Sequence, residues 1–269
     1  MSNSLLALRP SIHKTHGFSL PKDLSFTKGN PLSVVLIDEL TSLLPTYALG
    51  FAKANKDTFV LVSLQSIYKD ENVFLNEDSH WIGNYMPNVY KGYPFVLAEN
   101  MKDEKRVNTL CFNMQSDLYK EVPNEEAGDL RFFDDEGNPQ EIVQKVLTSL
   151  LEHNKYRQVT IKAVEAIVKA DILDPWILSS EDSDKELVQG LYRINEQKLK
   201  ALSGEVLETL NKVNALSIVY AQMLSIPRIE VLKKLHELKK NKQQEQEEKE
   251  LNLDEFFGEG GNDTISFDF

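Results

Sequence analysis

Cysteine is nearly absent from this sequence, since Cys111 is the only one among 269 residues. A single cysteine cannot form an intramolecular disulfide, so a disulfide-stabilised fold is excluded. Cys111 lies in the strand-like stretch 108–113, and free cysteines are among the most buried residue types. We therefore expect an unreactive thiol in the core, without the partners that a nucleophile or a metal ligand needs.

Positive charge is also scarce, because 30 Lys and Arg oppose 42 Asp and Glu and leave a net charge of −12. A surface that binds nucleic acid needs a net basic patch, so no direct nucleic-acid partner is expected. The same balance opposes attraction to an anionic membrane. The excess is uneven, since residues 236–269 carry four Lys and Arg against ten Asp and Glu.

Long apolar runs are missing as well. The longest, near 34–37 and 59–64, are far too short to cross a bilayer, so no membrane insertion is expected. Residues 1–10 lack the basic start and apolar run of an ordinary secretory signal. We expect a cytoplasmic start, and export to the cell surface by a route that reads a C-terminal signal stays open.

The common catalytic and metal-binding motifs do not occur. There is no Gly-x-Ser-x-Gly elbow, Gly-rich phosphate loop, His-Glu-x-x-His pair or Cys-x-x-Cys, and no cofactor is expected. Glu77, Asp78 and His80 are the candidates for a metal site. A surface turn is the favoured interpretation of these three, because neighbouring strand residues point to opposite faces. His153 and His236 are expected on helix surfaces.

Strand-like segments precede helical ones along the chain. Residues 1–30 contain prolines and glycines among polar residues, which predicts an extended arm with little regular structure. Short β-branched and aromatic stretches follow, bounded by turn-forming residues. They predict strands at 33–37, 58–64, 93–98, 107–112 and 130–133. Too few helices separate them for βαβ units, so an antiparallel or mixed sheet is favoured.

Helical spacing of apolar residues begins after Pro139. It predicts helices at 141–151, 159–170, 195–202, 204–224 and 229–238. Ile172–Leu178 contains Pro175 and predicts a loop anchored by Trp176, and 186–194 predicts a short extended excursion. Residues 239–250 are polar on every face, which predicts either a solvated helix or a disordered linker.

These patterns predict an α+β fold. We expect one domain at 31–238, β-rich at 31–138 and helical at 139–238. Residues 239–269 are expected to be a polar linker and a disordered, acidic, aromatic tail.

The most distinct local feature is an aromatic segment between His80 and Phe95. Its rings and one basic neighbour are Trp81, Tyr85, Tyr90, Lys91, Tyr93 and Phe95. Glycines and prolines between them break any long helix, so the rings pack through a shaped loop or short strands. Two interpretations remain. The rings fill the interface between sheet and helices, which is favoured, or they line a groove for a ligand or a protein partner.

Several short motifs occur in one order along the chain. They are Asn72-Val-Phe-Leu75, Trp81, Tyr85-Met-Pro87, Tyr93-Pro-Phe95, Leu110-Cys-Phe112, Phe132-Phe-Asp-Asp-Glu-Gly-Asn-Pro139, Leu173, Gly190-Leu-Tyr192, Asn195-Glu-Gln-Lys-Leu199 and the helix through Leu216–Leu224. In these motifs and their order the chain resembles the SapC family of bacterial proteins, from about residue 30 to about residue 235. The resemblance implies an association with bacterial surface layers and with type I secretion systems, and it supplies no catalytic residues.

Two positions depart from the family pattern. Lys91-Gly92 stand where the family usually has two arginines, so a contact between an arginine fork and an anion is in doubt here. Ile194-Asn-Glu196 stands where the family usually has Val-Asp-Glu, so an amide replaces one carboxylate.

The tail lies outside the resemblance. Residues 258–266 resemble one unit of the calcium-binding nonapeptide, with Glu259 at the place of a glycine, and chance is a serious rival because one unit cannot build a β-roll. The acidic and apolar end is typical of a type I secretion signal or of a docking peptide, and a solubilising end is the third interpretation. The residues concerned are Phe256, Phe257, Phe267, Asp268 and Phe269.

Three functions are compatible with these patterns. The first is a non-catalytic interaction or assembly protein whose partners are surface-layer or type I secretion components. The second is an enzyme or a small-ligand-binding protein that uses the aromatic segment 80–95. The third is an intracellular adaptor that docks its partners through the acidic tail.

Overall fold

Three antiparallel sheets make up the strand-rich part of the protein. The computed structural model describes residues 5–55, 58–102, 105–180 and 186–258, with the backbone alone at 100–102, 105–106 and 246–258. The largest sheet has the order β10-β11-β4-β5-β3. Its strands are β3 (Leu32–Val34), β4 (Leu49–Lys53), β5 (Phe59–Leu64), β10 (Leu173–Trp176) and β11 (Leu191–Ile194). Phe51 faces Leu61 across β4 and β5, and both are buried.

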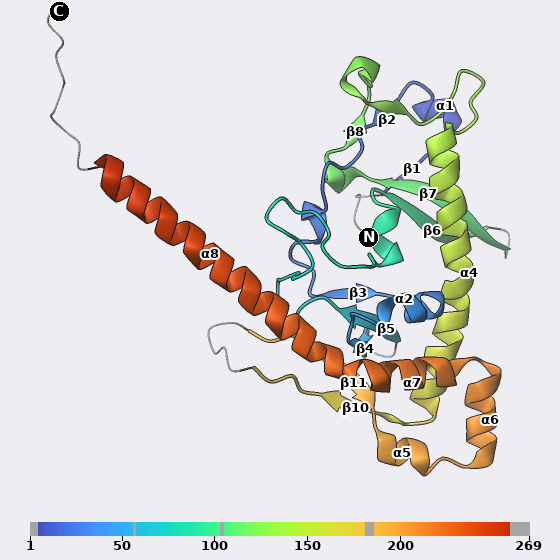
Figure 1. The fold of residues 1–269 in the computed structure, drawn as a ribbon. Helices are drawn as coiled ribbons and strands as arrows, with labels where there is room; N and C mark the ends of the chain where they lie inside the picture. Colours follow the sequence, from blue (N-terminus) through green and yellow to red (C-terminus); the bar gives the residue numbers. More distant parts are fainter. Residues whose placement is uncertain (1–4, 56–57, 103–104, 181–185, 259–269) are drawn as a thin grey trace, which may run out of the picture.

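The two smaller sheets lie at the other end of the molecule (Figure 1). One has the order β1-β7-β6, and the other has the order β8-β2-β9. Their strands are β1 (Leu5–Ala7), β2 (Gly17–Phe18), β6 (Phe95–Lys102), β7 (Lys105–Asn113), β8 (Tyr119–Lys120) and β9 (Leu130–Arg131). A short helix α1 (Pro10–His13) connects β1 to β2.

Helices dominate the second half of the chain. They are α4 (Glu141–Lys169), α5 (Glu196–Lys200), α6 (Gly204–Lys212), α7 (Ala215–Ser225) and α8 (Ile229–Gly258), and the short α2 (Leu40–Leu43) and α3 (Asn88–Lys91) lie among the strands. The α+β fold predicted from the sequence is therefore confirmed. The two helical patterns at 141–151 and 159–170 belong to one continuous helix, α4.

The described residues form two hydrophobic cores, and α4 contributes to both. The larger core lies between the central sheet and the helices and includes Ala163, Val164 and Ile167 of α4. The smaller core is aromatic, and Val143 of α4 packs into it. The rings of Phe18 and Phe132 stack there at 5.1 Å, and Phe95 meets Phe18 edge-on at 4.9 Å. Cys111 is buried, as predicted, and burial raises the pKa of its thiol.

Some expectations for local structure were wrong. Residues 5–18 were expected in an extended arm with little regular structure, but β1 pairs with β7 and β2 is the middle strand of its sheet. His13 ends helix α1 and is buried. The segment at 172–178, expected as a loop, contains β10, which is an edge strand. An edge strand tolerates Pro175, because proline there loses no hydrogen bond to a second neighbour.

Among the described residues, one helical run is long and apolar enough to cross a membrane, by length and composition alone. It covers Ala215–Glu245, and 39% of its most apolar window is buried inside the protein. Ile218, Val219 and Leu232 in this run are fully enclosed. A part of its apolar character therefore belongs to the core.

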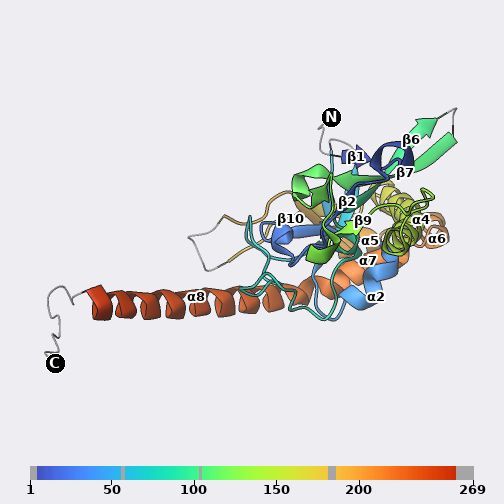
Figure 2. The same ribbon diagram turned by 90° about the horizontal axis from the view of Figure 1, so that it is seen from above.

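Helix α8 leaves the body and projects into solvent (Figure 1), and the view from above agrees (Figure 2). Its first turns carry buried Leu232 and His236. From Asn241 to Glu245 every residue is exposed. The segment at 239–250, for which a helix and a linker were both open, is helical.

Gly17 in β2 gives a test of the small aromatic core. A Cβ atom at this position would lie 2.2 Å from the carbonyl oxygen of Leu130 and 2.9 Å from Cβ of Pro123. We expect Gly17→Ala to lower the free energy of unfolding by about 2–3 kcal/mol, because the neighbouring strand must shift. Gly29→Ala is the matched control, since nothing lies within 4 Å of its added Cβ. Denaturant unfolding of both variants measures the difference, and equal stabilities would contradict the packing of β2.

Candidate functional site

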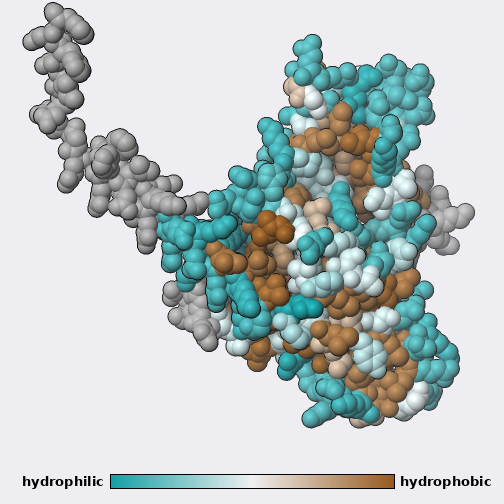
Figure 3. Space-filling model, viewed as in Figure 1, coloured by the Kyte–Doolittle hydropathy of each residue, from teal (hydrophilic) through white to brown (hydrophobic). Residues whose placement is uncertain are grey.

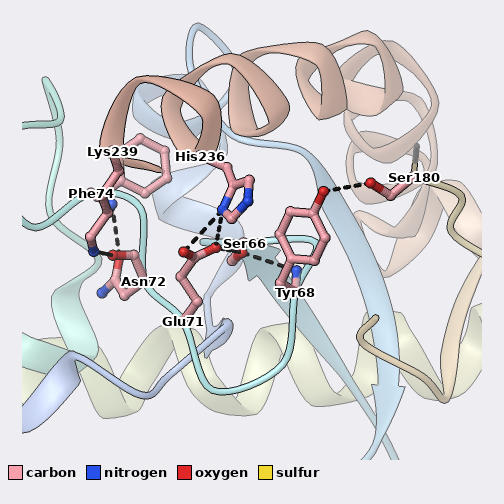
Figure 4. Close-up of polar contacts among 8 residues, drawn as sticks. All are labelled: Ser66, Tyr68, Glu71, Asn72, Phe74, Ser180, His236 and Lys239. Carbon is pink, nitrogen blue, oxygen red and sulfur yellow. Dashed lines mark hydrogen bonds and ion pairs between the residues drawn. The ribbon is translucent and has the colours of Figure 1, made fainter. Parts of the chain in front are cut away.

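A cluster of polar side chains marks the place where α8 meets the body (Figure 4). Glu71 comes from the loop after β5, and His236 comes from α8. The Nδ1 atom of His236 lies 3.0 and 2.9 Å from the two carboxylate oxygens of Glu71. The hydroxyl of Ser66 donates to Glu71 at 2.7 Å and accepts from the backbone N–H of Tyr68 at 3.0 Å. This junction joins the loop to the helix.

Burial makes this pair energetically important. The side chains of His236 and Glu71 are only 4% and 11% exposed. Burying a carboxylate is costly unless polar partners compensate it, and here the Ser66 hydroxyl and the His236 ring both contact it. Breaking such a pair leaves one polar group buried without its counterpart.

More contacts extend the junction on both sides (Figure 4). On one side, Lys239 donates from Nζ to the backbone oxygen of Asn72 at 3.1 Å. The Asn72 amide in turn donates to Thr27 at 3.3 Å. On the other side, the ring of Tyr68 lies 4.1 Å from that of His236, and its hydroxyl bonds to Ser180. Four separate parts of the chain therefore meet at the base of α8.

Serine, histidine and glutamate also occur together in nucleophilic catalysis, but here the hydrogen bonds connect them differently. In a serine hydrolase the histidine accepts the proton of the serine. Here Ser66 is fully buried, and its single proton is directed at the Glu71 carboxylate. The arrangement is suited to holding α8 in place.

A surface hollow of about 420 Å³ adjoins the junction. It is lined by Lys28, Lys69, Asp70, Glu71, Glu186, Lys239 and Gln243. Lys69 pairs with Glu186 at 3.1 Å, and this hydrogen bond raises the pKa of Lys69. Three lysines oppose three carboxylates in the lining, so the hollow favours no single sign of ligand charge.

A second buried carboxylate organises the aromatic segment. Glu39 is 1% exposed and accepts from the backbone N–H groups of Leu36 and Asn88 at 2.9 and 2.7 Å. Its third donor is the hydroxyl of Tyr85 at 3.0 Å. Burial, together with the negative charge of Glu39, raises the pKa of Tyr85, so this hydroxyl stays protonated and donates at neutral pH.

Three of the six residues of the aromatic segment reach the two cores. Tyr90 is buried and donates to Gln65, and Phe95 lies in the small aromatic core. Trp81 and Tyr85 are partly buried against the larger core. Tyr93 stacks on Phe26 at 3.7 Å, and exposed Lys91 lies 4.7 Å above the Tyr85 ring. Packing is thus the evident role of most of these rings.

The candidate metal ligands Glu77, Asp78 and His80 lie on an exposed turn. Asn76 closes this turn, because its side-chain oxygen accepts from the N–H of His80 at 2.7 Å. In the described part of the chain, no group of three or more His, Cys, Asp or Glu side chains is arranged to hold a metal ion. For the tail, Phe256 and Phe257 lie in the last turn of α8, and Phe267, Asp268 and Phe269 lie outside the described residues.

The prediction that His236 lies on a helix surface was wrong, since it is only 3% exposed. His236 follows the fully buried Leu232 by four residues, which places both on one face of the helix. The four-residue separation from Leu232 is therefore the sequence feature that indicates a buried His236. His153 is partly buried, and its Nδ1 atom is enclosed.

The comparison with family models gives one result that decides the family. The model of the SapC family matches residues 8–232, which is most of the chain. This chain belongs to the SapC family. The comparisons with curated proteins and with solved structures gave no match. The SapC family name by itself gives no activity.

The matched region ends in the first turn of α8. Ser66 and Glu71 lie inside it, and His236 lies four residues beyond it. The loop side of the junction therefore lies inside the matched region, and the α8 side lies just beyond it.

The junction predicts a large effect of His236→Ala. The change leaves the Glu71 carboxylate buried without the imidazole that faces it, so we expect the free energy of unfolding to fall by about 3 kcal/mol. Hydrogen exchange should also become faster at residues 229–239. Lys234→Ala on the exposed face of the same helix is the control, with an expected change within about 0.5 kcal/mol. A variant as stable as the control would show that α8 is held by other contacts.

The Glu39 centre predicts a smaller effect of Tyr85→Phe. Removing the hydroxyl takes one of three donors from a buried carboxylate, which should lower the free energy of unfolding by about 1–2 kcal/mol. Tyr220→Phe removes a hydroxyl from a half-exposed ring on α7 and should have almost no effect. Urea unfolding of the two variants tests this, and equal losses would argue against the Glu39–Tyr85 bond.

Proposed function

We propose that this SapC-family protein is a non-catalytic interaction or assembly protein whose contact element is the projecting part of α8 with the tail beyond it. The observation that carries this proposal is the exposure of every residue from Asn241 to Glu245 on a helix that continues to Gly258. An isolated polar helix gains no packing energy from its own domain. A helix in this position is suited to bind another molecule.

The family resemblance points to the class of partner. We propose protein components of a bacterial surface layer or of a type I secretion system. The distal half of α8 and the tail are acidic and contain Phe256, Phe257, Phe267 and Phe269. Aromatic residues among carboxylates fit an apolar pocket with a basic rim on such a partner. The same chemistry serves an adaptor that stays in the cytoplasm.

Co-purification from the bacterial host tests this proposal. A tagged full-length chain is compared with a chain that ends at Lys240, which keeps the Glu71–His236 junction. We expect surface-layer or secretion components with the full-length protein and their loss from the shortened one, while the melting temperatures agree within about 3 °C. A third chain that ends at Gly258 separates the helix from the tail. Recovery of the same partners with all three chains would rule out the proposed contact element.

A further inference from the structure

Charge is divided sharply along the last helical region. Residues 212–242 contain seven Lys and Arg against two Glu. Residues 243–258, the distal part of α8, contain six Asp and Glu against one Lys. The two blocks meet within α8, near Gln243 and Gln244. A helix with this division is complementary to a copy of itself that runs in the opposite direction.

Apolar side chains are exposed beside the basic block. Leu238 on α8 is 59% exposed, and Leu224 on α7 is 72% exposed. Figure 3 shows apolar surface over α7 and around the base of the projecting helix. Large aliphatic groups exposed next to a solvent-exposed stretch of helix mark a contact surface. The basic block thus combines charge with uncovered apolar area.

Helical spacing places the relevant positions on one face. Positions 231, 238, 242, 245, 249 and 256 are separated by seven, four, three, four and seven residues. Such spacings bring residues to one side of a helix with about 3.6 residues per turn. Leu238, Lys242 and Glu245 on this face are exposed. The face is therefore open at the centre of α8.

We propose that α8 is a dimerisation helix, which pairs antiparallel with α8 of a second copy of this chain. The pairing is centred between Gln243 and Gln244. Lys242 of each chain then lies opposite Glu245 of the other, and position 256, a phenylalanine, lies opposite Val231. This inference deepens the proposed function and rests on it, because it names a second copy of the chain as the first partner of α8.

Symmetry makes the contact self-complementary. A two-fold axis through the centre of the pair generates every contact twice, so each charge pair counts double. Each basic block faces an acidic block, and position 238 of one chain lies opposite position 249 of the other. A parallel pair would set Lys242 against Lys242 and Glu245 against Glu245. Charge therefore selects the antiparallel arrangement.

Charge reversal in the purified full-length chain tests the contact by analytical ultracentrifugation. We expect a wild-type dimer that weakens as salt is raised. Lys242→Glu and Glu245→Lys should each weaken it by about tenfold or more, because each places like charges opposite one another twice. Lys155→Glu on α4, an exposed lysine away from this face, is the control and should leave the dimer unchanged.

Mixing the two variants separates contacts between chains from effects within one helix. Both variants keep their own intrahelical like-charge pair in the mixture, yet the pairing across the dimer is restored. We therefore expect a heterodimer of about wild-type affinity. A wild-type chain that stays monomeric at high micromolar concentration, or a dimer that ignores both charge reversals, would overturn the proposal.

Cysteine cross-linking tests the direction of the pair, since native Cys111 is buried. Leu238→Cys should not cross-link with itself but should form a disulfide with Lys249→Cys in a mixture, because only those positions come within bonding distance. Self-cross-linking of Leu238→Cys would show a parallel pair and overturn the inference. These measurements need no host partner, so they can fail while the co-purification succeeds, and the reverse also holds.

Discussion

Helix α4 imposes the main constraint on the body, because both hydrophobic cores depend on its 29 residues. Val143 in its first turn belongs to the small aromatic core, and Ile167 near its end belongs to the larger one. One continuous helix fixes the distance between the two cores. The aromatic segment links the two cores, because Trp81 and Tyr85 pack against the larger one and Phe95 lies in the smaller one.

Two buried carboxylates then fix the parts that α4 does not reach. Glu39 ties the start of α2 to the aromatic segment through three donors. Glu71 ties the loop after β5 to α8 through Ser66 and His236. Buried acids are specific connectors, since their desolvation is compensated only when all partners are present. The position of α8 follows from the contacts of Glu71.

The sequence predicted the class of elements better than their connections. Apolar spacing identified the two ends of α4, and β-branched and aromatic composition identified β5, because both signals are local. Pairing between distant segments is not visible in local patterns, so the entry of β1 and β2 into sheets and of β10 and β11 into the central sheet was not foreseen. The edge position that accommodates Pro175 is likewise a property of the assembled sheet.

The site was predicted least well. The aromatic segment drew attention because its composition is unusual, yet its rings mainly pack. Glu71 and Ser66 are ordinary residues in the sequence, and they become important only because the fold brings His236 to them across 165 positions. The helix face shared by Leu232 and His236 could be predicted from their spacing. The loop residues that contact it, Ser66 and Glu71, could not.

The base of α8 also determines where its far end lies. Residues 240–258 extend for roughly 28 Å at about 1.5 Å per residue. A tilt of about 10° at the Glu71–His236 junction would therefore displace the far end by roughly 5 Å, about one helical turn. The geometry of the Glu71–His236 contact therefore determines where the far end of α8 can meet another molecule.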